Sequence, residues 1–286
     1  MSVQLKEKYV KSPLNYVGGK HKLLPQILPL FPEKIGTFID VFAGGCNVAA
    51  NVDAEVTIIN DKQAQVVDLI EYIYSRSIDE LLRELDAIIE SYQLSKTNKE
   101  GYLKLRADYN TGNVSPQMFY ALVTHSFNNQ IRFNQSGGFN MPFGKDRSSF
   151  NPMLRERFIR FKETLDEKSL SLRIGDFRDL ELDSYGNDRF VYCDPPYLIT
   201  TAAYNESGGW SEQDERDLYE WLDSINESGI KFALSNVIEH KGRTNDILTE
   251  WSRKYSTHNL SISYANSNYR SSNRDSVTRE VLITNY

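Results

Sequence analysis

Cysteine is scarce in this sequence and long apolar runs are absent, and both features limit the classes of protein to which the sequence can belong. The two cysteines among 286 residues, Cys46 and Cys193, are too few for a disulfide framework or a cysteine-based metal cluster. The four histidines stand far apart, without the spacing of metal ligands. No apolar run approaches the ~18 residues of a membrane span, and the charged residues 1–11 do not resemble a signal peptide. We therefore expect a cytoplasmic protein that needs neither a metal ion nor a membrane.

Basic residues are fewer than acidic ones, 33 against 39, so the formal net charge is −6. This balance argues against a surface that is basic throughout. The average hides one basic segment, residues 101–160, which contains eight Lys or Arg and three Asp or Glu. Such a segment fits either a face that meets phosphates or a solvated helical surface, and charge alone does not separate the two.

The sequence does contain a series of short apolar runs, each followed by a turn or a helical pattern. This alternation is typical of an α/β fold with a mostly parallel sheet covered on both faces. The predicted strands are 37–42, 56–59, 171–174, 190–193 and 231–234, with two further candidates at 258–264 and 280–285. The predicted helices are 62–75, 78–93, 153–165 and 212–228.

One long stretch, residues 63–152, breaks this rhythm. It begins with acidic helices and passes into residues 127–144, which are rich in Asn, Gln, Arg, Gly and Phe. That composition predicts a hairpin or loop rather than core. We therefore predict that residues 1–62 and 153–286 form the core domain and that residues 63–152 are an inserted, mainly helical module.

A glycine-rich turn follows the first core strand, in the segment Asp40-Val41-Phe42-Ala43-Gly44-Gly45-Cys46. In open α/β sheets, ligands bind outside the carboxyl ends of the strands, where glycine allows a sharp turn and a close approach. Asp61 ends the next strand, and a carboxylate there can accept both ribose hydroxyls of a nucleoside. The spacing does not match G-x-G-x-x-G, which favours a nucleoside without phosphates. A plain strand-to-helix turn is the alternative.

Two weaker motifs lie elsewhere in the chain. Asn15-Tyr16-Val17-Gly18-Gly19-Lys20 fits either a turn beside a ligand, flanked by Tyr16 and Lys20, or an ordinary N-terminal turn. In Gly175-Asp176-Phe177, the ring of Phe177 is suited to pack on an adenine face, and Asp176 to accept a hydrogen bond from it. A turn with a core phenylalanine is the simpler explanation of the second motif when it is taken alone.

The strongest signal is Asp194-Pro195-Pro196-Tyr197, directly after the apolar strand 190–193. Two prolines stiffen the backbone and remove two N–H donors. The Asp194 carboxylate and the Pro195 carbonyl remain as acceptors, and Tyr197 adds a flat ring worth about 1–3 kcal/mol in stacking on a base. This set matches an aromatic amine, which has two N–H donors on a planar ring. Hydrogen bonds from both N–H groups pull the nitrogen toward tetrahedral geometry, so that its lone pair can attack a methyl group.

Such an amine is buried in a duplex, so the base must first leave the stack. Residues 127–147 supply an aromatic side chain, amides and cations suited to filling the gap and gripping the backbone. Arginine reads guanine, and asparagine or glutamine reads adenine, through the major-groove edges. Interleaved aromatic and cationic residues therefore favour DNA contact over simple surface.

In this order, the segments resemble those of the Dam-type DNA adenine-N6 methyltransferases, the alpha-ordered amino methyltransferases of bacteria and phages. The similarity covers nearly the whole chain. The segments that carry it are Asn15-Tyr16-Val17-Gly18-Gly19-Lys20 (cofactor motif), Phe42-Ala43-Gly44-Gly45 (F-x-G-x-G loop), residues 127–144 (recognition hairpin) and Asp194-Pro195-Pro196-Tyr197 (catalytic tetrapeptide). The resemblance implies a Rossmann-like S-adenosylmethionine-dependent methyltransferase sheet, with residues 63–152 as the DNA-recognition domain.

The resemblance also implies residue roles. Phe127 is expected to wedge beside the target base, Asn128 to lie near its orphaned partner, and Arg132 to read a guanine. The predicted cofactor-binding residues are Tyr16, Gly18, Lys20, Asp40, Phe42, Gly44, Asp61, Asp176, Phe177 and Asp194. The predicted DNA-binding residues are Phe127, Asn128, Gln130, Arg132, Asn140, Pro142, Lys145 and Arg147. The predicted catalytic residues are Asp194, Pro195, Pro196 and Tyr197.

Family members typically methylate the adenine of GATC, but three positions depart from the pattern. Cys46 replaces the last glycine of the cofactor loop, Gln130 replaces an apolar residue that touches thymine, and Asp146 replaces a basic residue. We therefore expect GATC or a related site in double-stranded DNA. S-adenosylmethionine would be the cofactor, S-adenosylhomocysteine the product, and a restriction endonuclease for the same site a possible companion.

Two alternatives remain open from the sequence. The same chemistry would serve another planar amine, such as cytosine N4, an RNA base or a protein glutamine amide. A non-catalytic DNA-binding relative with a decayed cofactor site is the second alternative, although the intact cofactor and catalytic motifs argue against it.

Overall fold

The computed structural model describes residues 8–16, 18–112, 114–186, 188–200, 209–261 and 278–286. These residues form two compact units. The helical unit contains the described residues within 1–21, 44–51 and 63–174, and the sheet unit contains those within 22–43, 52–62 and 175–286. The predicted division into core domain and inserted module stays a prediction, because compactness does not show which residues contact DNA.

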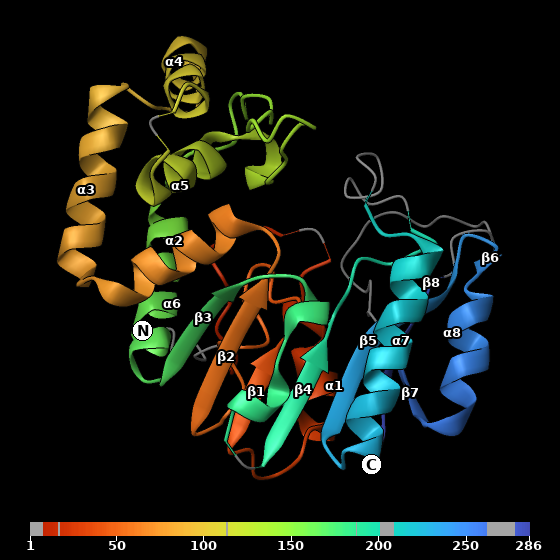
Figure 1. Ribbon diagram of the computed structural model, residues 1–286. Helices are drawn as coiled ribbons and strands as arrows, with labels where there is room; N and C mark the ends of the chain where they lie inside the picture. The colour runs from red at the N-terminus through yellow and green to blue at the C-terminus, as the bar shows by residue number, and fades with distance from the viewer. Residues whose placement is uncertain (1–7, 17, 113, 187, 201–208, 262–277) are drawn as a thin grey trace, which may run out of the picture. The chain divides into compact units, whose positions relative to one another are not determined.

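The sheet unit is built on strands in the order β2-β1-β4-β5-β8-β7 (Figure 1). The first four are parallel, whereas β8 runs antiparallel to β5, and β7 runs antiparallel to β8. A short strand, β6, pairs with the far end of β5. The strands are β1 (Thr37–Asp40), β2 (Val56–Asp61), β4 (Arg189–Cys193), β5 (Lys231–His240), β6 (Arg243–Thr244), β7 (Ser256–Leu260) and β8 (Thr278–Thr284). The predicted α/β fold with a mostly parallel sheet is confirmed.

Both faces of the parallel strands are buried within the sheet unit, which explains why these strands read as unbroken apolar runs. On one face, Ile39 and Val191 belong to a core cluster with Leu218 and Leu222 of helix α7 (Glu212–Glu227). On the other face lies an aromatic cluster made of Phe31, Phe38, Phe190 and Tyr192. The strand ends are therefore held rigidly from both sides.

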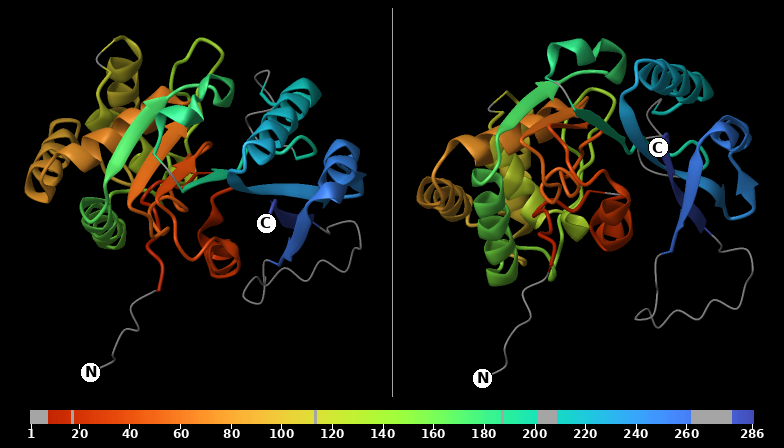
Figure 2. Two further views of the ribbon diagram at one scale, coloured as in Figure 1. Left: turned by 60° about the horizontal axis from the view of Figure 1, so that its bottom comes forward. Right: turned by 90° about the horizontal axis from the view of Figure 1, so that it is seen from below.

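Helix α7 and the shorter α8 (Asp246–Trp251) lie side by side on one face of this sheet (Figure 2). A reciprocal capping box between Ser211 and Asp214 fixes the start of α7. A short helix, α1 (Leu24–Ile27), precedes β1. The predicted helix 212–228 is thus confirmed, whereas α8 is not among the helices predicted from the sequence. Of the predicted strand 258–264, residues 262–264 lie outside the described residues.

The helical unit is organised around one largely buried helix, α5, which packs against α2, α3 and α4. Every residue from Phe119 to His125 in α5 is buried. The elements of this unit are α2 (Ala64–Ser75), α3 (Ile78–Ser91), α4 (Lys99–Asn110), α5 (Pro116–His125), α6 (Pro152–Asp166) and β3 (Leu170–Ile174). Polar side chains cap α3 to α6 at their N-termini, which sets where each begins.

The prediction that residues 127–144 contain no core was wrong. Phe139 and Met141 expose only 1% and 4% of their surface. Phe139 packs against Phe119 of α5, and Phe133 packs against both rings. The segment alternates inward aromatic residues with outward polar ones, as a half-buried hairpin does.

The described part of the chain contains no helix that is both long and apolar enough to cross a bilayer. Within the same ranges, no three His, Cys, Asp or Glu side chains are placed to hold a metal ion.

Candidate active site

Carboxylates gather at the carboxyl ends of the parallel strands in the sheet unit. Asp40 and Asp61 end β1 and β2, and Asp194 directly follows β4. The N–H of Gly175 donates to the Asp61 carbonyl over 3.1 Å, which brings the next residue, Asp176, to the same edge. The edge that the sequence predicted as a ligand site therefore carries four acidic side chains.

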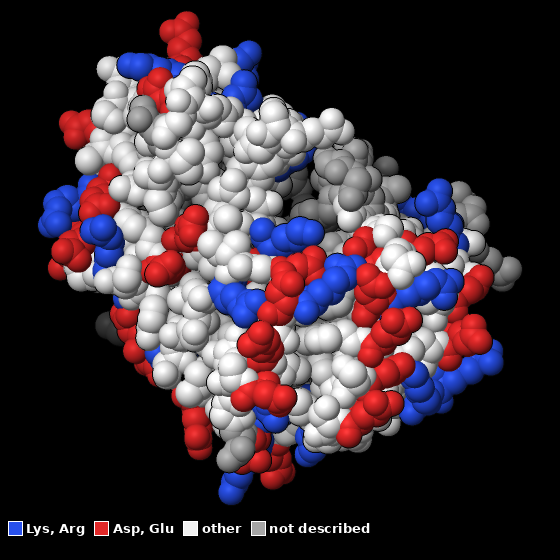
Figure 3. Space-filling model, in the orientation of Figure 1, with Lys and Arg blue, Asp and Glu red and all other residues white. Residues whose placement is uncertain are grey.

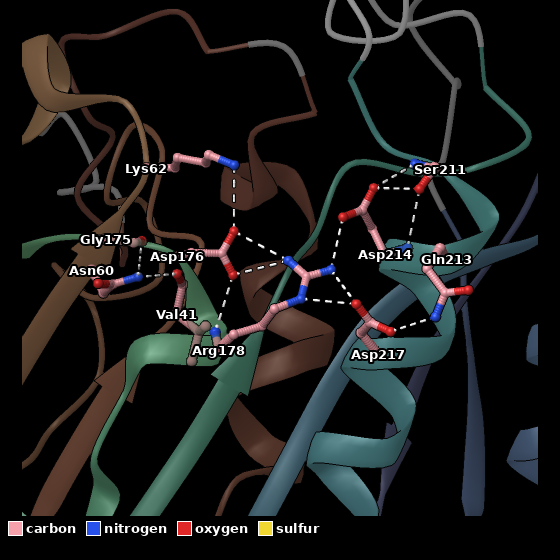
Figure 4. A network of polar contacts seen from close by, with 10 residues as sticks. All are labelled: Val41, Asn60, Lys62, Gly175, Asp176, Arg178, Ser211, Gln213, Asp214 and Asp217. Atoms are coloured by element: carbon pink, nitrogen blue, oxygen red, sulfur yellow. Dashed lines mark hydrogen bonds and ion pairs between the residues drawn. The ribbon is translucent and has the colours of Figure 1, made fainter.

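Asn60 ties two backbone segments together at this edge. Its amide donates to the carbonyls of Val41 (2.9 Å) and Gly175 (3.1 Å), as Figure 4 shows. The Asn60 side chain is buried, and its Oδ1 finds no hydrogen-bond partner among the described residues. The sequence did not single out Asn60, because its role depends on a segment 115 residues away. The unpartnered oxygen is an acceptor next to the predicted nucleoside site.

Arg178 joins the Gly175-Asp176-Phe177 turn to the first turns of α7 (Figure 4). Its Nη1 donates to both oxygens of Asp176 (3.0 and 3.2 Å), and Nη2 donates to Asp214 (2.8 Å). Both Nε and Nη2 donate to Asp217, at 2.9 and 2.6 Å. The guanidinium also lies 4.5 Å from the ring centroid of Phe177. The turn predicted to hold an adenine is therefore anchored by an arginine that sequence reasoning missed.

Mixed charge surrounds this cluster. Figure 3 shows acidic and basic side chains interleaved near the N-terminal end of α7, without a field of one sign. Lys62 adds to the pattern through an ion pair with Asp176 at 3.4 Å. Partial burial disfavours the charged form of Asp176, but bonds from Arg178 and Lys62 outweigh it and lower the pKa of the carboxyl below 3.8. The Asp214 pKa is lowered in the same way, against partial burial, by bonds from Ser211 and Arg178.

The Arg178 cluster predicts a distinct acid dependence of stability. Carboxyls with lowered native pKa values stabilise the fold above 3.8, and this stabilisation is lost as the pH falls through those lowered values. We expect Arg178→Met to be less stable than wild type at neutral pH and to lose less stability on acidification, so that the stabilities of the two proteins approach each other as the pH falls below 3.8. Melting temperatures between about pH 7 and pH 2.5 measure this. Arg216→Met, at an exposed position of α7 outside the cluster, is the control. Parallel curves for wild type and Arg178→Met would contradict the assignment.

Aromatic side chains form a wall beside the same turn. Phe42 lies 5.7 Å from Phe177 and 5.6 Å from Trp210, measured between ring centroids. Phe177 exposes only 2% of its surface, which leaves little of its ring for a ligand, whereas Phe42 and Trp210 are half-buried. Trp210 is a further residue that the sequence analysis missed. Trp210 directly precedes Ser211, the N-cap of α7, and this position often carries an apolar side chain that packs on the helix. That position in the sequence is the signal that could have identified Trp210.

The predicted catalytic tetrapeptide, Asp194-Pro195-Pro196-Tyr197, follows β4 directly, with Pro195 buried and its neighbours half-buried. The Tyr197 hydroxyl lies 2.9 Å from a carboxylate oxygen of Asp194 and 2.9 Å from one of Glu280 in β8. Burial, followed by the charges of Asp194 and Glu280, raises the pKa of Tyr197 well above its ordinary value, so it stays a hydroxyl. Tyr197 is thus held at its backbone, which follows the two prolines, and at its hydroxyl, which contacts two carboxylates. Glu280 was not predicted as a site residue.

In the helical unit, Gly44 of the predicted cofactor loop lies close to Tyr16 of the N-terminal motif. A Cβ added to Gly44, whose φ is +47°, would lie 3.1 Å from the ring of Tyr16, so only glycine fits there. Gly18 also has a positive φ. The buried ammonium of Lys20 donates to the Gly18 carbonyl at 2.8 Å. The cofactor contacts predicted for Tyr16, Gly18, Lys20 and Gly44 stay predictions.

Cys46 occupies a backbone conformation that suits glycine, since its φ is +58° and its side chain is fully buried. We expect Cys46→Gly to be more stable than Cys46→Ala by about 0.5–1 kcal/mol. Both changes remove the sulfur, but only alanine keeps a Cβ in the left-handed region, a penalty that exceeds glycine's larger unfolded-state entropy. Urea unfolding of the two variants measures the difference. A more stable alanine variant would contradict the left-handed assignment.

The predicted recognition hairpin, residues 127–144, lies in the helical unit. Isolated bridges join Ser126 to Phe143 and Phe133 to Phe139. The Asn128 backbone is left-handed, with a φ of +56°, and its carbonyl accepts a bond from the Asn15 amide at 2.7 Å. The predicted hairpin is confirmed, and its base is tied to the residue before Tyr16.

Most predicted DNA-binding side chains lie on the surface of this unit. Phe127 is 39% exposed, which is unusual for a phenylalanine, and Arg147 lies 5.2 Å from its ring centroid. Arg147 Nη1 also lies 3.4 Å from the Asn128 amide oxygen. The exposed members of the predicted set are Phe127, Asn128, Arg132, Pro142, Lys145 and Arg147, and the half-buried ones are Gln130 and Asn140. Their contacts with DNA stay predictions.

Comparison with known proteins decides the family. The family model described as D12 class N6 adenine-specific DNA methyltransferase matches residues 16–266, most of the chain. This chain belongs to that family. The Dam-type resemblance inferred from the motifs is thereby confirmed, and the D12 class methyltransferases imply a methyl donor of the S-adenosylmethionine type.

Three curated relatives of this D12 class chain are modification enzymes. It is 45% identical over 282 residues to Type II methyltransferase M.FokI of Planomicrobium okeanokoites, covering 97% of this chain. It is 42% identical to modification methylase StsI of Streptococcus sanguinis and 36% identical to modification methylase LlaI of Lactococcus lactis, over 98% and 96% of this chain. The chain spans only 43% of the length of each of these three relatives.

The sheet unit of this D12 class chain fits such a methyl donor. The residues at the strand ends offer hydrogen-bond acceptors: the carboxylates of Asp61, Asp176 and Asp194 and the unpartnered Oδ1 of Asn60. S-adenosylmethionine presents ribose hydroxyls, an adenine amine, an ammonium and a sulfonium, all of which are donors or positive charges. An edge that offers acceptors and negative charge therefore matches it.

Proposed function

We propose that this chain transfers a methyl group from S-adenosylmethionine to N6 of an adenine in a short double-stranded DNA sequence, GATC or a related site. The target base would be turned out of the helix for the reaction. The observation that carries the proposal is the corner at Asp194-Pro195-Pro196-Tyr197, where the hydroxyl of Tyr197 is held between Asp194 and Glu280.

The chain's own groups supply positioning and electrostatics. One N6–H donates to the Asp194 carboxylate and the other to the Pro195 carbonyl, which draws the nitrogen lone pair out of conjugation. S-adenosylmethionine, when bound, supplies the electrophilic methyl group. Asp194 would also stabilise the positive charge that develops on N6 and would accept the departing proton after the transfer. Because the two prolines stiffen the corner and Glu280 holds the ring of Tyr197, little reorganisation is needed.

DNA contact would fall to the recognition hairpin and its flank. Phe127 would wedge into the stack, a role that its exposed aromatic ring and its contact with Arg147 support. Lys145 and Arg147 are exposed cations suited to phosphates. The basic segment noted in the sequence therefore favours DNA over a solvated helix. A cytoplasmic location and a companion restriction endonuclease are predictions that belong to this proposal.

Nucleoside mass spectrometry tests the function. Duplex DNA is incubated with the purified chain and S-adenosylmethionine, then digested to nucleosides. We expect N6-methyldeoxyadenosine and no N4-methyldeoxycytidine. Methylated cytosine, or methylation of RNA in preference to DNA, would replace the proposed substrate. Binding of S-adenosylmethionine without any methylated product would favour a non-catalytic relative.

A further inference from the structure

The side chain of Arg132 on the recognition hairpin is hydrogen-bonded to Asn140, which lies on the opposite strand-like arm of the hairpin. Its Nε donates to the Asn140 side-chain oxygen at 2.8 Å, and its Nη2 donates to the Asn140 backbone carbonyl at 3.1 Å. The N–H of Asn140 donates back to the Arg132 carbonyl at 3.0 Å. Arg132 is exposed, whereas Asn140 is half-buried. Two hydrogen bonds thus fix the exposed guanidinium, and the third joins the backbones of the two arms.

Asn140 is itself held by buried neighbours. The Phe139 backbone bonds in both directions with the Asn110 amide, at 2.9 and 3.0 Å. The Met141 carbonyl accepts from the Tyr102 hydroxyl at 2.8 Å and from Arg106 at 3.0 Å. Helix α4 supplies all three of these partners, so the arm that carries Asn140 is fixed to the helical core.

The hydrogen bonds to Asn140 occupy one edge of the Arg132 guanidinium and leave a second edge available to a ligand. Nε and Nη2 form the side edge, which faces Asn140. The end edge, with Nη1 and the second hydrogen of Nη2, has no hydrogen-bond or ion-pair partner among the described residues. Two parallel N–H donors on one edge match O6 and N7 of guanine in the major groove. Among the described residues, no carboxylate forms an ion pair with Arg132. The guanidinium is therefore held by its hydrogen bonds to Asn140 and not by charge pairing.

We propose that Asn140 is a positioning residue for target specificity, which orients Arg132 so that its end edge reads a guanine of the recognition sequence. This inference rests on the proposed function and refines it. From the sequence, Asn140 was predicted to contact DNA directly. In the structure both of its oxygens accept hydrogen bonds from Arg132 instead, so its effect on specificity passes through the arginine.

The test compares the sites methylated by four variants in cells without other adenine methylation, by single-molecule sequencing of plasmid DNA. Arg132→Ala should lose selectivity at one guanine position. Asn140→Ala should relax the same position, by about 10-fold in the ratio of guanine to other bases. Asn140→Asp keeps the acceptor oxygen and should retain the wild-type site, with lower overall methylation because of its charge.

Asn134→Ala is the control for a merely structural role of Asn140. Asn134 lies on the same hairpin, where its side chain bonds Ser136 and the Gly138 N–H. It should lower total methylation without changing the site. Circular dichroism confirms that each variant folds.

Oligonucleotides separate positioning from general damage to the hairpin. Replacing the guanine in question by 7-deazaguanine removes the N7 acceptor. This should slow wild type about 10-fold, slow Asn140→Ala less, and leave Arg132→Ala unaffected. The inference is overturned if Asn140→Ala keeps wild-type selectivity, relaxes a different position from Arg132→Ala, or is matched by Asn134→Ala. A wild-type chain that leaves no N6-methyladenine overturns the proposed function, and this inference with it.

Discussion

Asp194→Ala is expected to reduce single-turnover methyl transfer by at least about 10²–10³-fold while leaving DNA binding within a few-fold of wild type. The change removes the carboxylate that accepts one N6–H and steadies the developing charge. It also removes one of the two acceptors that hold the hydroxyl of Tyr197. Asp194 lies in the sheet unit, whereas the predicted DNA-reading side chains all lie in the helical unit, so the effect should fall on the rate rather than on DNA affinity.

Two milder variants locate the effect within the corner. Asp194→Asn keeps one oxygen for the amine and should retain part of the rate. Tyr197→Phe keeps the ring but frees it from Asp194 and Glu280, and should slow transfer less than Asp194→Ala does. Rapid-quench kinetics with saturating DNA and cofactor measure all three. If Asp194→Ala transfers at the wild-type rate, Asp194 does not hold the amine.

The corner was predictable because its information is contiguous. An apolar strand, an aspartate, two prolines and a tyrosine follow one another, and the strand end of an α/β sheet is where ligands bind. Glu280 was not predictable in the same way, because it lies 83 residues after Tyr197 in the sequence. The two side chains meet only because β8 pairs antiparallel with β5. Pairing between distant strands is decided by tertiary packing, which no local pattern records.

The central helix of the helical unit shows a second limit. α5 is buried on every side between Phe119 and His125, so it lacks the polar face that gives a helix its periodic signature. The hairpin was misjudged for the opposite reason. Its Asn- and Gly-rich composition is that of a loop, yet Phe139 and Met141 fill the core between its polar residues. Periodicity therefore failed to reveal α5, and composition failed to reveal the buried residues of the hairpin.

Polar contacts made at a distance account for the remaining misses. Asn60, Arg178 and Trp210 act through partners that are far away in sequence or on another element. Each supports a turn that the sequence did identify. The sequence therefore predicted the residues that face the ligand edge better than the residues that hold them there.

Glu215→Gln is expected to destabilise the sheet unit by about 3 kcal/mol, because this fully buried carboxylate collects four donors. One oxygen accepts from Trp210, and the other accepts from Tyr219, Asn236 and Asn245. Burial, followed by the charge of Glu215, raises the pKa of Tyr219 well above its ordinary value, so that hydroxyl stays a donor. A glutamine can keep its oxygen toward only one side and must turn its NH2 group toward donors on the other.

The geometry of the substitution predicts which contact fails. Keeping three donors on the glutamine oxygen sets its NH2 against the Trp210 indole N–H, so Trp210 should lose its anchor beside Phe42. Urea unfolding measures the stability, and the fluorescence of Trp210 in a background with Trp221 and Trp251 replaced by phenylalanine measures its release. Glu220→Gln makes the same chemical change at an exposed position of α7 and should stay within about 0.5 kcal/mol of wild type. If Glu215→Gln is as stable as Glu220→Gln, the carboxylate is not the acceptor that joins α7 to β5 and fixes the aromatic wall.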